Sequence, residues 1–189
     1  MRCPAAVAVA ACIGLIAGCG NARTRVPSPT RPAPAGGFRT LRFPATGVSF
    51  SAPRSWQVIP QRPPLVTVVA SGNAVIALWR YPRRGPAPGS ASLLSAAKTA
   101  LFAAIHSRQG SISVIGSRTT HIGGAPAIEF DATELVGGRS RRVLSTHVFE
   151  GADEVVLEEY APPAVFPKLR HAVFARVRHS LAVGPAATG

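Results

Sequence analysis

The second half of the chain contains β-type segments joined by turns that are too short to hold a crossover helix. Residues 112–120, 127–135, 142–149 and 155–160 are rich in β-branched and aromatic side chains or alternate between apolar and polar positions. Parallel strands need connections of about a dozen residues or more, whereas hairpins close with about two to five. These segments therefore predict an antiparallel sheet.

The turn at Gly137-Gly138 decides how two of these strands align. A three-residue loop would place the apolar positions of 128–132 on the same face as those of 144–148, with Glu134 opposite Arg142. A two-residue loop would break that alignment, because side chains alternate between the two faces of a strand. The apolar pattern favours the three-residue loop.

The first half of the chain adds a β-hairpin and then a helix. Residues 65–70 and 74–81 are β-type, and Ser71-Gly72-Asn73 between them has hairpin turn chemistry. Ser90 is a suitable N-cap for a helix that ends near Gly110. Its apolar positions recur at helical spacing and are Leu93, Leu94, Ala97, Leu101, Ala104 and Ile105.

A second helix is predicted over about residues 163–181. Apolar residues repeat every four positions, which predicts one face that packs on the sheet: Val165, Leu169, Val173, Val177 and Leu181, with Phe166 and Phe174 beside them. The opposite arc is basic. We expect it to be exposed, and two interpretations stay open: a solvated face, or a surface that contacts an anionic partner through Lys168, His171, Arg178 and His179.

The order strands, helix, strands, helix predicts an α+β fold, in which an antiparallel β-sheet of about six to seven strands is flanked by helices as an αβα sandwich. The length after the N-terminal region is that of one domain. We expect the domain to cover residues 38–183, with a flexible tail over 184–189.

Three sequence features resemble the PsbP-like fold, which is shared by a photosystem II extrinsic subunit, a Ran-binding nuclear import factor and bacterial lipoproteins of the LpqN type. They are Gly47-Val48-Ser49-Phe50 followed by Pro53 and Trp56, Gly123-Gly124-Ala125-Pro126-Ala127 before a strand, and a C-terminal helix over 166–180 that ends in Ser-Leu. The resemblance covers roughly residues 41–183 and implies a binding or assembly module without a shared catalytic site.

The N-terminus resembles a lipoprotein export signal. Residues 5–18 contain no charged side chain, and Ile16-Ala17-Gly18-Cys19 has the form of a lipobox. A run of roughly 14 residues suits a signal peptide better than a helix across a ~30 Å hydrocarbon core. We expect a signal peptide over 1–18, a lipid on Cys19 and a proline-rich linker over 19–37.

Export and composition limit the classes of partner. The folded part contains no cysteine, because Cys3 and Cys12 lie in the signal and Cys19 carries the lipid, so no disulfide and no cysteine-ligated metal is expected. The formal net charge is +13. Export removes nucleic acid as a partner, and anionic lipid or cell-wall polymer is the remaining candidate for a basic surface.

The sequence contains no motif that points to a reaction or a cofactor. The five histidines lack the spacing of a helical metal pair, and there is no G-x-S-x-G. His147 is expected on a strand surface. The eight acidic residues all fall between Glu129 and Glu159, and we interpret them as a solvated strand face paired with Arg139, Arg141 and Arg142.

Together these observations predict a membrane-tethered extracytoplasmic lipoprotein that acts as a non-catalytic binding or assembly module, with no cofactor and no metal. Its partners are the membrane, through the N-terminal lipid, and an envelope protein or anionic polymer. Two alternatives stay open: a hydrolase whose site is assembled from scattered residues, and a basic module that binds anionic lipid or wall polymer.

Overall fold

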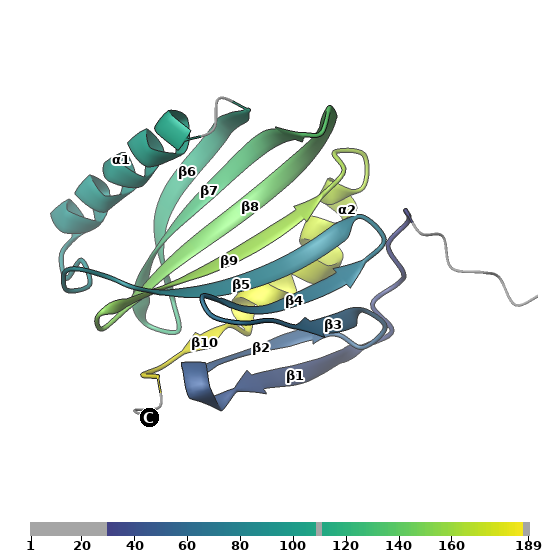
Figure 1. The fold of residues 1–189 in the computed structure, drawn as a ribbon, viewed down its shortest axis with the longest axis horizontal. Helices are drawn as coiled ribbons and strands as arrows, with labels where there is room; N and C mark the ends of the chain where they lie inside the picture. Colours follow the sequence, from purple (N-terminus) through teal and green to yellow (C-terminus); the bar gives the residue numbers. More distant parts are fainter. Residues whose placement is uncertain (1–29, 109–110, 187–189) are drawn as a thin grey trace, which may run out of the picture.

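The computed structural model describes residues 30–108 and 111–186. Ten strands, a short 3-10 helix (Pro44–Thr46) and two longer helical regions form the domain (Figure 1). The strands are β1 (Phe38–Phe43), β2 (Val48–Pro53), β3 (Gln57–Pro60), β4 (Leu65–Ser71), β5 (Ala74–Pro82), β6 (Ile112–Ile122), β7 (Ala125–Val136), β8 (Arg139–Glu150), β9 (Asp153–Ala161) and β10 (Ala182–Val183). The helices are α1 (Ala91–Arg108), α2 (Phe166–Leu169) and α3 (Ala175–His179), with a π-helical turn (Arg170–Phe174) joining the last two.

Seven of the strands form one sheet in the order β3-β4-β5-β9-β8-β7-β6, and every neighbouring pair is antiparallel. A second sheet has the order β1-β2-β10. Consecutive strands from β6 to β9 are joined by hairpins, as the short turns require. The predicted α+β fold is confirmed, with a helix on each side of the large sheet.

The turn between β7 and β8 differs from the prediction. Val136 pairs with Arg139, so the loop is the two residues Gly137-Gly138, and Glu134 lies opposite Arg141 rather than Arg142. Both glycines have positive φ, 55° and 74°, which a two-residue type I′ turn requires. The prediction of three residues was wrong because it aligned apolar positions, whereas this pair of strands also buries charged ones.

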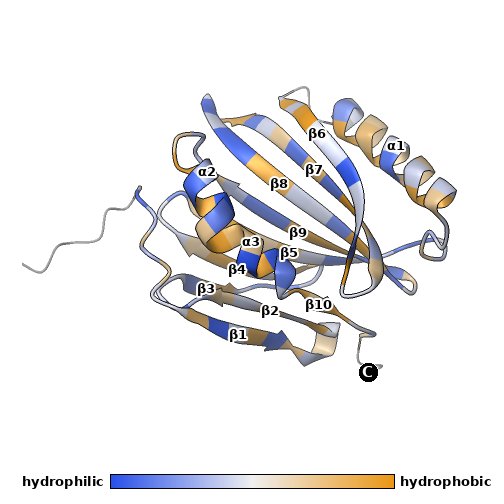
Figure 2. Cartoon of the chain, turned by 180° about the vertical axis from the view of Figure 1, so that it is seen from behind, coloured by the Kyte–Doolittle hydropathy of each residue, from blue (hydrophilic) through white to orange (hydrophobic). Residues whose placement is uncertain are grey.

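The main core lies between the large sheet and α2, the π-helical turn and α3, which together form one C-terminal helix over 166–179. Figure 2 shows this helix across one side of the sheet, beside β2 and β10. Val173, Phe174 and Val177 are buried against strands of both sheets. Trp56 contacts Phe174 edge to face, with ring centroids 6.4 Å apart. The four-residue ladder therefore packs as predicted.

On the other side of the sheet, α1 packs mainly on the β6–β7 edge. Leu94 is buried in a small cluster with Ile128 and Phe130, and the Ser90 hydroxyl accepts a hydrogen bond from the Leu93 amide at 3.3 Å, as expected for an N-cap. Leu93 itself is 58% exposed. Its predicted place on the packed face was wrong, because the buried stripe of α1 is narrower than the apolar pattern suggested.

Both predicted boundaries of the domain are too narrow. Trp56 donates a hydrogen bond from its indole to the Ala33 carbonyl at 3.1 Å, and the Asn73 amide donates to Thr30. At the other end, the Gly184 amide donates to the Gly47 carbonyl at 2.9 Å. Residues 30–37 thus belong to the domain rather than to a linker, and the start of the expected tail is docked.

Candidate functional site

One side of the large sheet is covered by a helix at only one edge. α1 contacts β6 and β7, and among the described residues no helix lies in front of β8, β9 and β5 in Figure 1. We call this side of the three strands the open face. Because side chains alternate along a strand, it is formed by Arg141, Val143, Ser145 and His147 of β8, Glu154, Val156, Glu158 and Tyr160 of β9, and Val75, Ala77, Trp79 and Tyr81 of β5.

The open face has an apolar floor. Ala77, Val143 and Val156 are buried, yet they belong to neither core cluster. Their cover comes from larger neighbours on the same face rather than from a packed helix. Aromatic side chains that are half-buried or exposed stand around them, namely Trp79, Tyr81 and Tyr160. The apolar surface that a ligand could bury on this face therefore belongs to the aromatic rings that cover the floor.

A chain of hydrogen bonds crosses the middle of the open face. The Ser145 hydroxyl lies 3.1 Å from His147 Nε2, and His147 Nδ1 lies 2.6 Å from Glu154 Oε1. The His147 ring also packs edge to face on Phe130 at 5.8 Å, which fixes its orientation. Ser145 and His147 are two residues apart on β8, and the turn into β9 brings Glu154 to the ring.

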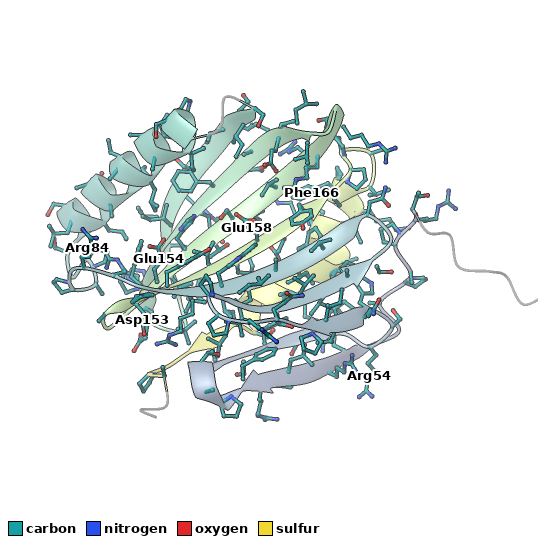
Figure 3. The ribbon with its side chains drawn as sticks, in the orientation of Figure 1. Arg54, Arg84, Asp153, Glu154, Glu158 and Phe166 are labelled. Atoms are coloured by element: carbon teal, nitrogen blue, oxygen red, sulfur yellow. The ribbon has the colours of Figure 1, made fainter. Side chains whose placement is uncertain are left out.

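Glu158 is the second carboxyl group near this centre, directly opposite Ser145 on β9. Figure 3 labels Glu154 and Glu158 along that strand. Burial raises the pKa of Glu158; the nearby His147 opposes this rise, and Glu134 adds to it. Burial is also the main cause of a raised pKa at Tyr81, to which both β9 carboxylates contribute. Burial on this face therefore disfavours the ionised form of Glu158 and of Tyr81.

Arg141 stands at one end of the open face. Its guanidinium pairs with Glu134 of β7 and lies 4.1 Å from the centroid of the Tyr160 ring. Burial raises the pKa of Tyr160, and the Arg141 charge opposes that rise. The aromatic ring and the acid thus hold the guanidinium in place.

The opposite side of the sheet contains a closed arginine–acid cluster beneath the C-terminal helix. Its members are Arg118, Arg142, Arg170 and Arg178 with Glu129, Asp131 and Glu159. Asp131 accepts hydrogen bonds from Arg142 at 2.6 Å and from Arg170 at 2.7 Å. Glu159 is fully buried and pairs with Arg178. Burial raises the pKa of Glu159 to about 8, although Arg178 opposes the shift.

This cluster ties the helix to the sheet rather than forming a ligand site. A surface hollow of about 210 Å³ reaches Arg118, Glu129, Asp131 and Arg170, but each of these side chains is already in an ion pair. The acids were predicted to be a solvated face. That interpretation was wrong for Glu129, Glu134 and Glu159, which are buried, although the predicted partners Arg141 and Arg142 do pair with acids.

The predicted basic arc is only partly exposed. Lys168, His171 and His179 are exposed on the C-terminal helix, but the Arg178 side chain is 11% exposed and points to Glu159. Arg178 lies one turn after the buried Phe174, so it shares that side of the helix. The prediction of Arg178 as a surface residue is therefore corrected. Cys19, the predicted lipid attachment site, lies outside the described residues.

No group of three histidine, cysteine, aspartate or glutamate side chains within 30–108 and 111–186 is arranged to hold a metal ion. No helix in the described ranges is both long enough and apolar enough to span a bilayer.

Comparison with solved structures shows a PsbP-like fold, as the sequence resemblance implied. The chain is similar to cyanobacterial PsbP (CyanoP) from Synechocystis sp. PCC 6803, with a TM-score of 0.60 and 13% identity over 78% of this chain and 93% of that chain. It is similar to LpqN of Mycobacterium tuberculosis, with a TM-score of 0.56 and 15% identity over 82% and 90% of the two chains. It is also similar to a Pseudomonas aeruginosa protein of unknown function, with a TM-score of 0.53 and 15% identity over 79% of this chain and 99% of that chain. No family model and no curated protein sequence matches the chain.

Proposed function

We propose that the chain is a membrane-tethered extracytoplasmic lipoprotein that binds an amphipathic ligand on the open face of its sheet. The single observation that carries the binding part is the pairing of an apolar floor with a hydrogen-bonded centre. The buried floor is lined by aromatic rings that stay accessible, those of Trp79, Tyr81 and Tyr160. Ser145 and His147 belong to the centre. A ligand with an apolar chain and a polar group matches both.

The proposed location is supported by the N-terminal pattern and by the fold. Ile16-Ala17-Gly18-Cys19 has the form of a lipobox. LpqN, which shares the fold, is involved in cell envelope biogenesis. Lys168, His171 and His179 form an exposed basic strip that would favour the approach of the domain to anionic lipid or wall polymer. An envelope protein that delivers or receives the ligand would be a further partner.

The anchor is tested by replacing Cys19 with alanine. We expect the variant to lose metabolic incorporation of a radiolabelled fatty acid and to leave the membrane fraction, because the thiol that would accept the diacylglycerol is gone. Replacing Cys12 with alanine is the matched control, since it lies inside the expected signal. Fatty-acid labelling that persists in Cys19→Ala would rule out this anchor.

Binding on the open face is tested with a fatty acid that carries a nitroxide, which quenches tryptophan fluorescence only at short range. The chain has two tryptophans: Trp79 on the open face, and Trp56, which is buried in the main core at 1% exposure. We expect saturable quenching in the parent that is largely lost in Trp79→Phe. Quenching that survives this change would place the fatty acid away from the open face.

A further inference from the structure

The direction of each hydrogen bond in the chain Ser145–His147–Glu154 follows from the groups involved. An ionised carboxylate can only accept a hydrogen bond. With Glu154 ionised, His147 Nδ1 carries a proton and donates it to Glu154 Oε1 at 2.6 Å. In the neutral form of the ring, Nε2 is then the free acceptor, and the Ser145 hydroxyl donates to it at 3.1 Å. In that form the hydroxyl faces a base whose orientation is fixed on both sides.

This connectivity is that of a nucleophile activated by a base, which is in turn oriented by an acid. Such triads are recognised by geometry and by roles rather than by position in the sequence. All three side chains come from neighbouring strands of a rigid sheet, which holds them with little freedom. The apolar floor lies beside the hydroxyl, since Val143 precedes Ser145 on the same face of β8 and Val156 lies opposite His147 on β9.

The negative charge of a tetrahedral intermediate at Ser145 needs a donor that the strand backbone does not supply. β8 lies between β7 and β9, so its amides near Ser145 are engaged in the ladders. Glu158 is directly opposite Ser145 and belongs to the same face. A neutral carboxylic acid can donate a hydrogen bond to an oxyanion, and burial raises the pKa of Glu158 in the direction that favours its neutral form.

We propose that Ser145 is an acyl-accepting nucleophile, with His147 as its general base, Glu154 as the positioning residue that orients His147, and Glu158 as the oxyanion donor. The substrate class is a carboxylic ester or thioester whose apolar acyl chain lies on the floor of the open face. The placement of the acyl chain rests on the proposed function; the serine chemistry rests on the hydrogen-bond geometry.

The reaction has two balanced steps. Ser145 Oγ attacks the carbonyl carbon while its proton passes to His147 Nε2. The bond to the alcohol or thiol then breaks, and the leaving group takes that proton, so that the acyl group stays on Ser145 as an ester. In the second step water attacks the ester, with His147 again accepting and returning one proton, and the carboxylic acid leaves. No oxidant, reductant or metal is needed.

A fluorescent alkyl fluorophosphonate tests the nucleophile directly. It forms a phosphorus–oxygen bond with an activated serine and releases fluoride. Membranes that contain the full chain are treated with the probe, and the labelled residue is identified by mass spectrometry. We expect one adduct, on Ser145, and release of nitrophenol from p-nitrophenyl butyrate by the unlabelled protein.

Variants show whether Ser145 is labelled because its hydroxyl is activated or merely because it is accessible. Ser145→Ala should abolish the adduct, whereas Ser113→Ala, at an exposed serine on β6, should leave it unchanged. His147→Ala should slow labelling by about 100-fold or more. Glu154→Gln should slow labelling while the nitroxide quenching of Trp79 stays the same, which a purely structural role would not predict. Glu158→Gln keeps a donor and should react faster than Glu158→Ala.

Each outcome decides between the two proposals. Normal quenching of Trp79 without an adduct on Ser145 would overturn acyl transfer and leave binding on the open face intact. Labelling of Ser145 without quenching would keep the chemistry and remove the fatty-acid binding. An adduct that persists in Ser145→Ala, or one as strong in His147→Ala as in the parent, would overturn the assignment of the nucleophile.

Discussion

Replacing Arg178 with methionine should lower the free energy of unfolding by about 3–5 kcal/mol, which is the usual consequence of removing one partner of a buried ion pair. The Arg178 guanidinium pairs with the fully buried Glu159, and its Nε lies 3.7 Å from Glu129. Without it, the fully buried Glu159 loses the cation with which it pairs, and Glu129 keeps its ion pair with Arg118. Urea unfolding followed by circular dichroism measures the change.

The loss of unfolding free energy caused by Arg178→Met should grow as the pH rises. Burial raises the pKa of Glu159 to about 8 in the folded chain, whereas an unfolded glutamate titrates at about 4.3. The folded state then binds more protons than the unfolded state between these values, so stability falls as pH rises through this window. Loss of Arg178 moves the folded pKa higher still. The variant should therefore keep losing stability above pH 8, where the parent levels off.

Two further variants show whether the buried pair is the cause. Lys168→Met, at an exposed position of the same helix, should change stability by less than about 0.5 kcal/mol. Adding Glu159→Gln to Arg178→Met should restore much of the lost stability, because the amide needs no counter-charge. If Arg178→Met unfolds at the same urea concentration as Lys168→Met, the cluster does not tie the helix to the sheet.

Replacing Phe174 with alanine should also lower the free energy of unfolding by about 3–5 kcal/mol, because it leaves a cavity in the main core. Phe174 is fully buried, with its ring centroid 6.4 Å from that of Trp56 and 5.6 Å from that of Phe166. Phe102→Ala on α1, where the side chain is 40% exposed, is the matched control and should cost much less. Equal losses would mean that the C-terminal helix does not form the core described here.

The class of fold could be predicted from local sequence because turn length excludes crossovers and because each helix has one apolar stripe. Register could not. The aligned apolar faces favoured a three-residue loop at Gly137-Gly138, but Glu129 and Asp131 of β7 turn toward the main core side and are neutralised there by arginines of other elements. A strand that buries charge on one face has no clean apolar alternation, so the pattern pointed to the wrong loop.

The candidate site depends on the pairing of β8 with β9, whose consequences for these side chains sequence reasoning missed. Ser145 and His147 share a strand face, a signal that is present in the sequence but common. Only the pairing of β8 with β9 brings Glu154 to His147 and Glu158 opposite Ser145. Arg178 was misplaced for a related reason: its buried partner Glu159 is on a strand, and helical periodicity alone cannot show that a charge points inward.

The proposed ligand site is the open face rather than the basic strip of the C-terminal helix. Paramagnetic broadening of backbone amide NMR signals by the nitroxide fatty acid maps its position on the isotope-labelled protein. We expect broadening of the amides of β5, β8 and β9, with the signals of β1 and β2 unaffected. Broadening that is strongest on the C-terminal helix around Lys168 and His171, with β8 and β9 unchanged, would contradict binding on the open face.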